Sequence, residues 1–156
     1  PTRRSSDLEV YSRIKVGPSG TTQGLDPFAR GKLANMHADL AQAYHDAGLV
    51  REAIGEYEKA VGLCPQFADL QTKLGALLRE INDLASARSR YEAALEAKPN
   101  YVPARLQLGI LLLAVGDTSG ARDHWEHVIS LEPDNSQAKM YLRMLERRAT
   151  QPPPAD

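Results

Sequence analysis

The chain has 156 residues, 42% of them hydrophobic and 25% charged, which suits one globular domain with a hydrophobic core. Its 19 basic and 20 acidic residues nearly cancel, so we expect no nucleic-acid partner. The longest apolar run, Ile110 to Val115, is far short of the roughly 20 residues that cross a bilayer, so no membrane span is expected. The single cysteine, Cys64, cannot form an internal disulfide and leaves the compartment open, with the cytoplasm favoured.

The ends of the chain differ in composition from its middle. Residues 1–8 resemble the translation of a common sequencing adaptor, so we expect them to be non-native and upstream sequence to be missing. Residues 9–25 contain three glycines and a proline and are expected to form a short N-terminal segment that runs into a loop. Residues 150–156 include three consecutive prolines and are expected to form a disordered tail.

Apolar periodicity and helix-ending residues predict seven helices. The expected ranges, in chain order, are 27–47, 50–63, 68–81, 84–97, 102–115, 118–131 and 136–148. The first helix is expected to begin early because Asp26, followed by a proline, is a suitable cap. Its residues Leu33, Met36 and Leu40 are apolar, and we expect residues 9–25 or a missing element to cover them.

Five columns of residues recur along the chain at a spacing of 34 positions. They are Ala53, Ala87 and Ala121; Tyr57, Tyr91 and Trp125; Leu40, Leu74 and Leu108; Gly48, Asn82 and Gly116; and Pro65, Pro99 and Pro133. The glycine and asparagine column suits the left-handed turn that ends a helix, and the prolines end the next helix, so the helices should form antiparallel pairs. Asp83 and Asp117 can cap the second helix of two pairs, whereas the first pair has Leu49 there.

Small and aromatic side chains predict how the helices pack. Ala41, Gly75 and Gly109 should let the two helices of a pair approach closely, and the aromatic column should fill the gap between repeats. The stripes expected to be buried in the second and third repeats are Leu70, Leu74, Leu77, Leu78 and Ile81, and Leu108, Leu111, Leu112 and Val115.

These columns, with L-A-x-x-Y at Leu40–Tyr44 and L-G-x-x-L at Leu74–Leu78 and Leu108–Leu112, resemble the tetratricopeptide repeat (TPR) family. The resemblance implies an all-α fold, an α-solenoid of antiparallel helix pairs that forms a TPR superhelix. We expect a TPR domain at 26–149 with repeats 34–67, 68–101 and 102–135 and a capping helix 136–149. In the capping helix, Arg143 and Glu146 replace small or apolar residues, which indicates a face built for solvent.

Stacked helix pairs curve, and their first helices line an inner surface that binds a protein or peptide partner. The predicted binding residues of the first two repeats are Asn35, Gln42, His45, Asp69, Thr72, Lys73, Ala76 and Arg79. In the third repeat, Leu106, Ile110 and Leu113 should lie on the same wet side, and Met140 and Met144 should extend this apolar patch. The patch predicts a groove for an apolar or amphipathic peptide. The alternative is that the chain's own ends or tight curvature fill it.

Some TPR proteins clasp a partner's C-terminal carboxylate with Lys, Arg and Asn on this surface. The matching positions here are Ala38, Gln42, Lys73, Pro103 and Gln107. Only Lys73 fits, so that specificity is not expected.

No motif predicts catalysis or a cofactor. His124 and His127 flank Trp125 but lack a third ligand nearby, so we expect no metal and interpret them as ordinary exposed helix residues. The sequence contains no glycine-rich phosphate loop and no nucleophile motif. The favoured function is therefore a binding scaffold rather than an enzyme. A docking or regulatory arm of a larger protein and a self-assembling structural protein are the alternatives, and the oligomeric state stays open.

Overall fold

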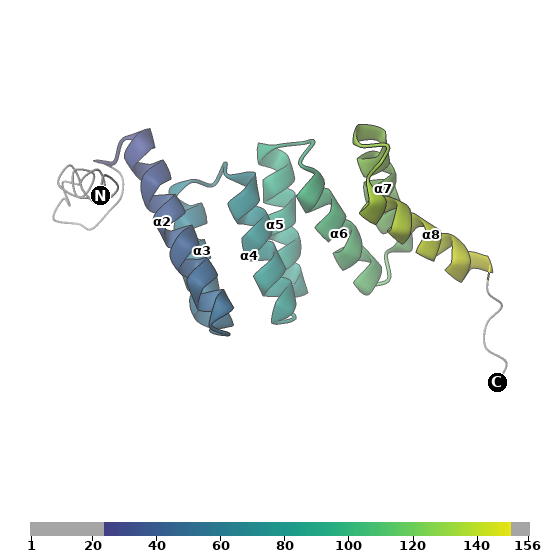
Figure 1. The fold of residues 1–156 in the computed structure, drawn as a ribbon, viewed down its shortest axis with the longest axis horizontal. Helices are drawn as coiled ribbons and strands as arrows, with labels where there is room; N and C mark the ends of the chain where they lie inside the picture. The colour runs from purple at the N-terminus through teal and green to yellow at the C-terminus, as the bar shows by residue number, and fades with distance from the viewer. Residues whose placement is uncertain (1–23, 151–156) are drawn as a thin grey trace. The chain divides into compact units, whose positions relative to one another are not determined.

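The computed structural model describes residues 24–150 and has no strand in that range. Its helices are α2 (Pro27–Asp46), α3 (Val50–Leu63), α4 (Ala68–Glu80), α5 (Leu84–Ala97), α6 (Val102–Ala114), α7 (Thr118–Leu131) and α8 (Ser136–Thr150) (Figure 1). The chain divides into two compact units, one ending at Pro65 and one beginning at Gln66. The first holds the α2–α3 pair, and the second holds the α4–α5 and α6–α7 pairs and α8. The adaptor-like residues 1–8, most of the predicted N-terminal segment and nearly all of the predicted tail lie outside the described residues.

The first helix of every pair ends in the same hydrogen-bonded turn. Gly48, Asn82 and Gly116 have positive φ angles of 78°, 64° and 90°. Each donates its N–H to the carbonyl three residues back, and the following residue donates to the carbonyl five residues back. This pattern satisfies carbonyls that a helix end leaves free. The predicted left-handed turns are confirmed.

The residues just before two of these turns correct the sequence prediction. Ile81 and Val115 were expected in the buried stripes, but their side chains are 41% and 53% exposed. Both are the last residue before a left-handed turn, so they follow the final helical residue, and their side chains leave the packed face. For the same reason α2, α4 and α6 each end one residue earlier than predicted.

Side-chain caps start several helices as the sequence indicates. The carboxylates of Asp26, Asp83 and Asp117 accept the N–H three residues later at 3.0, 3.1 and 2.9 Å. Helix α3 follows Leu49, which provides no side-chain hydrogen bond. The first N–H groups of α3 therefore lack the carboxylate acceptor that α5 and α7 have.

Glycines in the second unit lie against the aromatic rings of their own helix pair. A Cβ atom on Gly75 would lie 2.6 Å from the Tyr91 ring, and one on Gly109 would lie 2.4 Å from the Trp125 indole nitrogen. The predicted close approach is confirmed, but these rings occupy space inside a pair rather than only between repeats. Trp125 also stacks on Tyr141 of α8, with ring centroids 4.7 Å apart. The Trp125 side chain of α7 thus contacts both α6 and α8.

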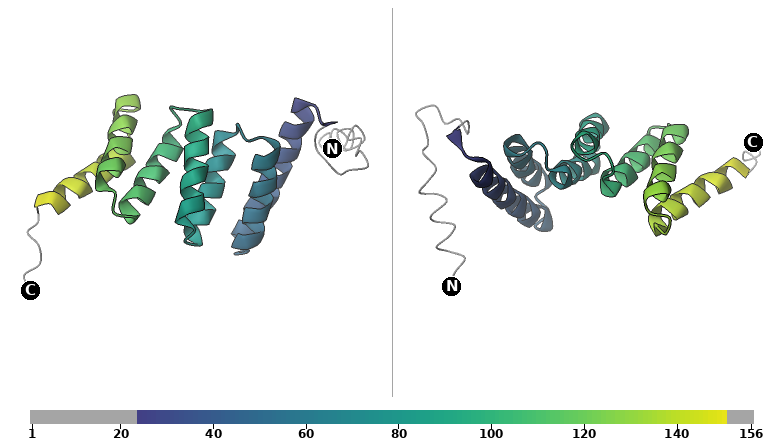
Figure 2. Two further views of the ribbon diagram at one scale, coloured as in Figure 1. Left: turned by 180° about the vertical axis from the view of Figure 1, so that it is seen from behind. Right: turned by 90° about the horizontal axis from the view of Figure 1, so that it is seen from above.

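Small residues also let neighbouring pairs of the second unit pack together. Ala68, Ala94 and Ala104 form a buried cluster that joins α4, α5 and α6, and Leu95 and Tyr101 pack against it. The views in Figure 2 show the order α4 to α8 in this unit from behind and from above. Residues that carry only a methyl group permit this close contact because larger side chains would hold the backbones apart.

Helix α8 packs on α7 through one face. Ala138 and Leu145 on that face are buried, while Arg143 and Glu146 are exposed. The last helix of the unit is therefore amphipathic, with a charged side turned to solvent, in agreement with the sequence interpretation.

Candidate partner-binding surface

A pocket of about 240 Å³ lies in the second unit where α4, α6 and α8 meet. Its lining consists of Thr72, Lys73, Ala76, Pro103, Leu106, Gln107 and Gln137. The 34-residue register explains this set, because residues at equivalent positions of successive first helices lie side by side. Thr72 corresponds to Leu106, Lys73 to Gln107, and Pro103 to Gln137.

The pocket combines one cation with amides and an apolar wall. Lys73 is exposed and has no acidic partner among residues 24–150. The Gln107 side-chain oxygen is buried and lacks a hydrogen-bond partner in the same range. Thr72 already donates its hydroxyl to the Ala68 carbonyl at 2.7 Å. The unsatisfied groups are therefore the Lys73 ammonium and the Gln107 oxygen, which suit a ligand with both a negative charge and a donor.

Four of the predicted binding residues meet in this pocket: Thr72, Lys73, Ala76 and Leu106. Asp69 is exposed outside the lining, and Arg79 is half-buried beside the Tyr91 hydroxyl. Burial raises the pKa of Tyr91, and the positive charge of Arg79 opposes that rise. The charge of Arg79 thus acts on Tyr91, a buried residue of the same helix pair.

The predicted apolar patch on α6 is corrected by the structure. Leu106 was expected on the wet side, but it is only 6% exposed, and Ile110 and Leu113 are half-buried. Helix α6 contacts α4, α5 and α7, so neighbours cover most sides of this nearly all-apolar helix. The pocket beside Leu106 combines this apolar wall with the polar side chains of Thr72, Lys73, Gln107 and Gln137.

The two methionines of the predicted patch line a different hollow from the pocket. Met140 and Met144 line a hollow with Arg143, Arg147 and Arg148, all on α8, and neither lines the pocket. They share the helix face opposite Ala138 and Leu145, since residues three and four apart lie on the same side of a helix. Met140 and Met144 repeat the positions of Leu106 and Ile110 at the 34-residue spacing, so their continuity with the α6 patch stays a prediction.

The predicted binding residues of the first unit lie along α2. Asn35 and Gln42 are exposed, and His45 is half-buried. The Gln42 amide donates to Asp46 at 2.8 Å, and the Tyr57 hydroxyl donates to the Gln42 oxygen at 3.5 Å. Gln42 therefore already has partners within its own unit.

Three pocket residues were not included in the predicted site, namely Pro103, Gln107 and Gln137. Pro103 and Gln107 were considered only as positions that match the carboxylate-binding residues of other TPR proteins, and the 34-residue spacing is the signal that places all three in the site. Gln107 repeats the position of Lys73, and Gln137 repeats that of Pro103. Extending the first-helix positions into the capping helix would have included Gln137.

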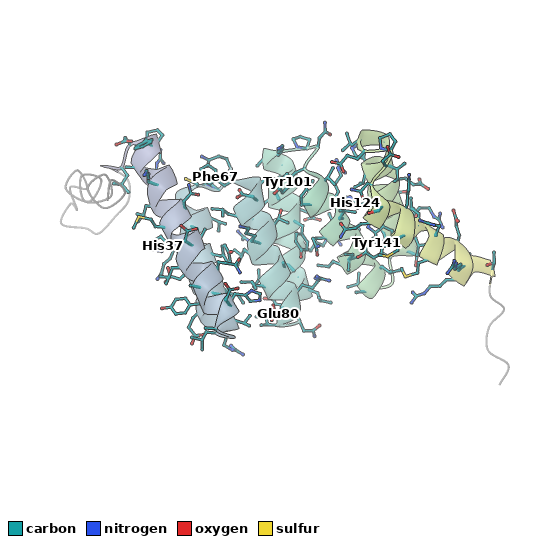
Figure 3. All side chains as sticks on the ribbon, viewed as in Figure 1. His37, Phe67, Glu80, Tyr101, His124 and Tyr141 are labelled. Atoms are coloured by element: carbon teal, nitrogen blue, oxygen red, sulfur yellow. The ribbon has the colours of Figure 1, made fainter. Side chains whose placement is uncertain are left out.

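A polar contact joins the helices of the first two pairs at positions 19 residues apart. His37 Nδ1 lies 2.6 Å from Glu56 Oε2 in the first pair (Figure 3). A hydrogen bond from Lys59, with a further contribution from His37, holds the pKa of Glu56 below its usual value against the opposing effect of burial. In the second pair, Arg90 donates to the Gln71 oxygen at 3.3 Å. These contacts join the two helices of a pair.

The third pair has two basic side chains at these positions, Arg105 and His124, of which His124 is labelled in Figure 3. Arg105 donates through Nε and Nη2 to the Pro99 carbonyl oxygen at 3.1 and 2.8 Å. Burial lowers the pKa of His124, and the positive charge of Arg105 lowers it further. Both effects favour the neutral form of the His124 ring.

The histidines and the cysteine do not assemble into a metal site. His124 and His127 are half-buried rather than exposed as predicted, and each has one buried ring nitrogen without a hydrogen-bond partner within 24–150. No group of three or more His, Cys, Asp or Glu side chains in that range could hold a metal ion. Cys64 is buried, and burial raises the pKa of its thiol. No helix among the described residues is long and apolar enough to cross a membrane.

The chain is a helical-repeat protein. Its antiparallel helix pairs recur every 34 residues, and the same left-handed turn joins the two helices within each pair. Residues 34–67 match one family model described as tetratricopeptide repeat, and residues 78–145 match another with the same description. The chain belongs to the tetratricopeptide repeat family. The comparison with curated proteins gave no significant match.

Solved TPR domains share this fold. The first TPR of Spaghetti (RPAP3), bound to the HSP90 peptide SRMEEVD, has a TM-score of 0.72 and 24% identity over 78% of this chain and 96% of its own. The Arabidopsis OM64 TPR domain has a TM-score of 0.71 and 19% identity, covering 76% and 98%. The first TPR domain of human RPAP3 has a TM-score of 0.69 and 25% identity, covering 74% and 91%.

Proposed function

We propose that this chain is a protein-interaction domain that holds an acidic segment of a partner protein in the α4–α6–α8 pocket. The observation that carries the proposal is Lys73, whose ammonium group has no carboxylate partner in the described part of the chain. Beside it, the buried Gln107 oxygen needs a donor. A carboxylate of an extended peptide would pair with Lys73, and a backbone N–H of the same peptide would donate to Gln107.

The relatives support a peptide as the ligand. The Spaghetti domain holds the peptide SRMEEVD, which contains three acidic side chains. The present pocket has one lysine and two glutamines, so we propose recognition of an acidic side chain or terminus by a single cation. The same binding would serve a stand-alone adaptor or a docking arm of a larger protein.

A titration with a labelled peptide tests this function. The probes are SRMEEVD and a matched peptide in which both glutamates and the terminal aspartate are replaced by amides, with an amidated C-terminus. The acidic peptide should bind and shift the NMR amide signals of Lys73, Gln107 and Gln137, and the neutral peptide should bind at least tenfold more weakly. Lys73→Glu should weaken the acidic peptide about tenfold, which is about 1.4 kcal/mol.

The control for charge is Arg51→Glu, because Arg51 is exposed on α3 in the first unit and makes the same change in net charge. Affinity should be unchanged in this variant. Equal binding of both peptides, or shifts confined to residues outside the pocket lining, would refute the pocket as the site.

A further inference from the structure

The side of α8 opposite Ala138 and Leu145 carries a second hollow, and none of its lining residues lines the pocket. Met140, Arg143, Met144 and Arg147 follow one another at spacings of three and four residues, which places them on one side of the helix. The opposite side, with Ala138 and Leu145, is buried. Figures 1 and 2 show α8 reaching away from the α6–α7 pair, so its last turns extend beyond that pair.

This face carries unbalanced positive charge. Helix α8 contains four basic residues and one acidic residue, whereas the whole chain has a net charge of -1. Lys139 pairs with Asp134 at 3.4 Å. Arg143, Arg147 and Arg148 have no carboxylate partner among the described residues. The carbonyl end of a helix favours basic residues, which accounts for a basic last turn but not for Arg143 one turn earlier.

Apolar side chains lie within the basic surface. Met140 is 52% exposed, and Met144 is half-buried beside it. Both line the same hollow as the three arginines. Methionine and arginine are the side chains enriched in protein interfaces, where an apolar centre is surrounded by a polar rim. A flexible thioether also adapts to the shape of a partner.

We propose that this α8 face docks an acidic amphipathic helix of a partner protein. The positive charge of the face favours a partner helix with acidic residues. The two methionines favour apolar side chains between those acidic residues on the partner helix. A nucleic acid would satisfy the guanidinium groups but offers no apolar contact for the thioethers. A membrane surface binds helices whose outer face carries Trp, Phe or Leu, and this face has only methionines.

The contact is small, so it should be weak and sensitive to salt. The stripe from Met140 to Arg147 spans about 10 Å of helix. Interfaces of this size form transient complexes, and exposed ion pairs lose strength as salt screens them. We expect binding in the micromolar range or weaker at low salt.

The test uses the full chain and two helix-forming peptides with the same leucine stripe, one flanked by glutamates and the other by lysines. The glutamate peptide should bind in 50 mM NaCl and lose at least tenfold in affinity at 300 mM. Arg143→Glu combined with Arg147→Glu should abolish binding, and Met140→Ser combined with Met144→Ser should weaken it severalfold. Circular dichroism checks that each variant keeps its helical signal.

Controls separate this surface from the pocket. Lys73→Glu should leave the leucine–glutamate peptide unaffected, and the double arginine variant should still bind SRMEEVD. The proposal is overturned if the lysine peptide binds equally well, if the arginine variant binds normally, or if no binding occurs at 50 mM NaCl. Stronger binding to phosphatidylserine vesicles or to duplex DNA than to the glutamate peptide would overturn it in favour of those ligands.

Discussion

Gly109 sets the distance between α6 and α7. Its missing side chain leaves room for the Trp125 indole, and a Cβ atom there would lie 2.4 Å from the indole nitrogen. Trp125 is fully buried and stacks on Tyr141, so it has little freedom to move aside. A methyl group at position 109 therefore has to push two helices apart or force the ring out of its stack.

We predict that Gly109→Ala lowers the free energy of unfolding by about 1–3 kcal/mol. Urea unfolding followed by Trp125 fluorescence measures the change. The matched control is Gly62→Ala on α3, where nothing lies within 4 Å of the added atom. That change should stabilise the chain by about 0.5–1 kcal/mol, because alanine favours a helix over glycine. Equal effects at the two positions would contradict the steric argument.

His124 should make stability depend on pH. Burial and Arg105 lower its pKa below 6.5 in the folded chain, so the unfolded chain binds more protons between the two pKa values. The contribution of His124 to the free energy of unfolding is therefore fully present above about pH 6.5, and it is lost as the pH falls through the pKa of the folded chain. The free energy of unfolding should be lower at pH 5.5 than at pH 7.5, and His124→Gln should reduce that difference.

An NMR titration of the His124 ring checks the cause. Its midpoint should lie below the ordinary 6.5 and should move upward in Arg105→Met, because the variant removes a nearby positive charge. An unchanged midpoint would leave burial alone as the source of the shift.

At the scale of elements, α3 lacks the cap that α5 and α7 have. Leu49 has φ and ψ of -90° and 69°, close to the -84° and 75° of Asp83, so an aspartate fits the same backbone. Leu49 is 44% exposed and loses little burial when replaced. Leu49 in the first repeat therefore leaves a helix end that a single change can complete.

We predict that Leu49→Asp stabilises the chain by about 1 kcal/mol at neutral pH, through a hydrogen bond to the N–H of Glu52. Thermal unfolding at pH 7 measures the gain. The reciprocal change, Asp83→Leu, should lower the melting temperature, because Asp83 accepts the Ser86 N–H at 3.1 Å. A loss of stability in Leu49→Asp would mean that packing of the leucine outweighs the cap.

At the scale of the whole molecule, the sequence predicts helices and turns well because their signals are local. Gly48, Asn82 and Gly116 end helices through their own backbone conformation, and Asp83 and Asp117 cap the helices that follow. No distant contact is needed to produce these features. The repeat spacing then aligns them, and the helix order follows.

The binding site was harder to predict because it depends on how helices cover one another. Leu106 is buried by neighbours of α6, which the period of the helix does not reveal. Gln137 joins the pocket only because α8 continues the register of the first helices. Met140 repeats the position of Leu106 at the 34-residue spacing, yet it lines a hollow with the arginines of α8 rather than the pocket.

The Trp125–Tyr141 stack has a consequence for how such an array can grow by gene duplication. Each 34-residue stretch carries its own turn and its own cap or helix start. If an extra copy of residues 68–101 were inserted before residue 102, α6 would still pack against an Ala94 side chain. A copy inserted after residue 135 would separate Trp125 from Tyr141. We therefore expect insertion of a repeat before residue 102 to be tolerated better than insertion after residue 135.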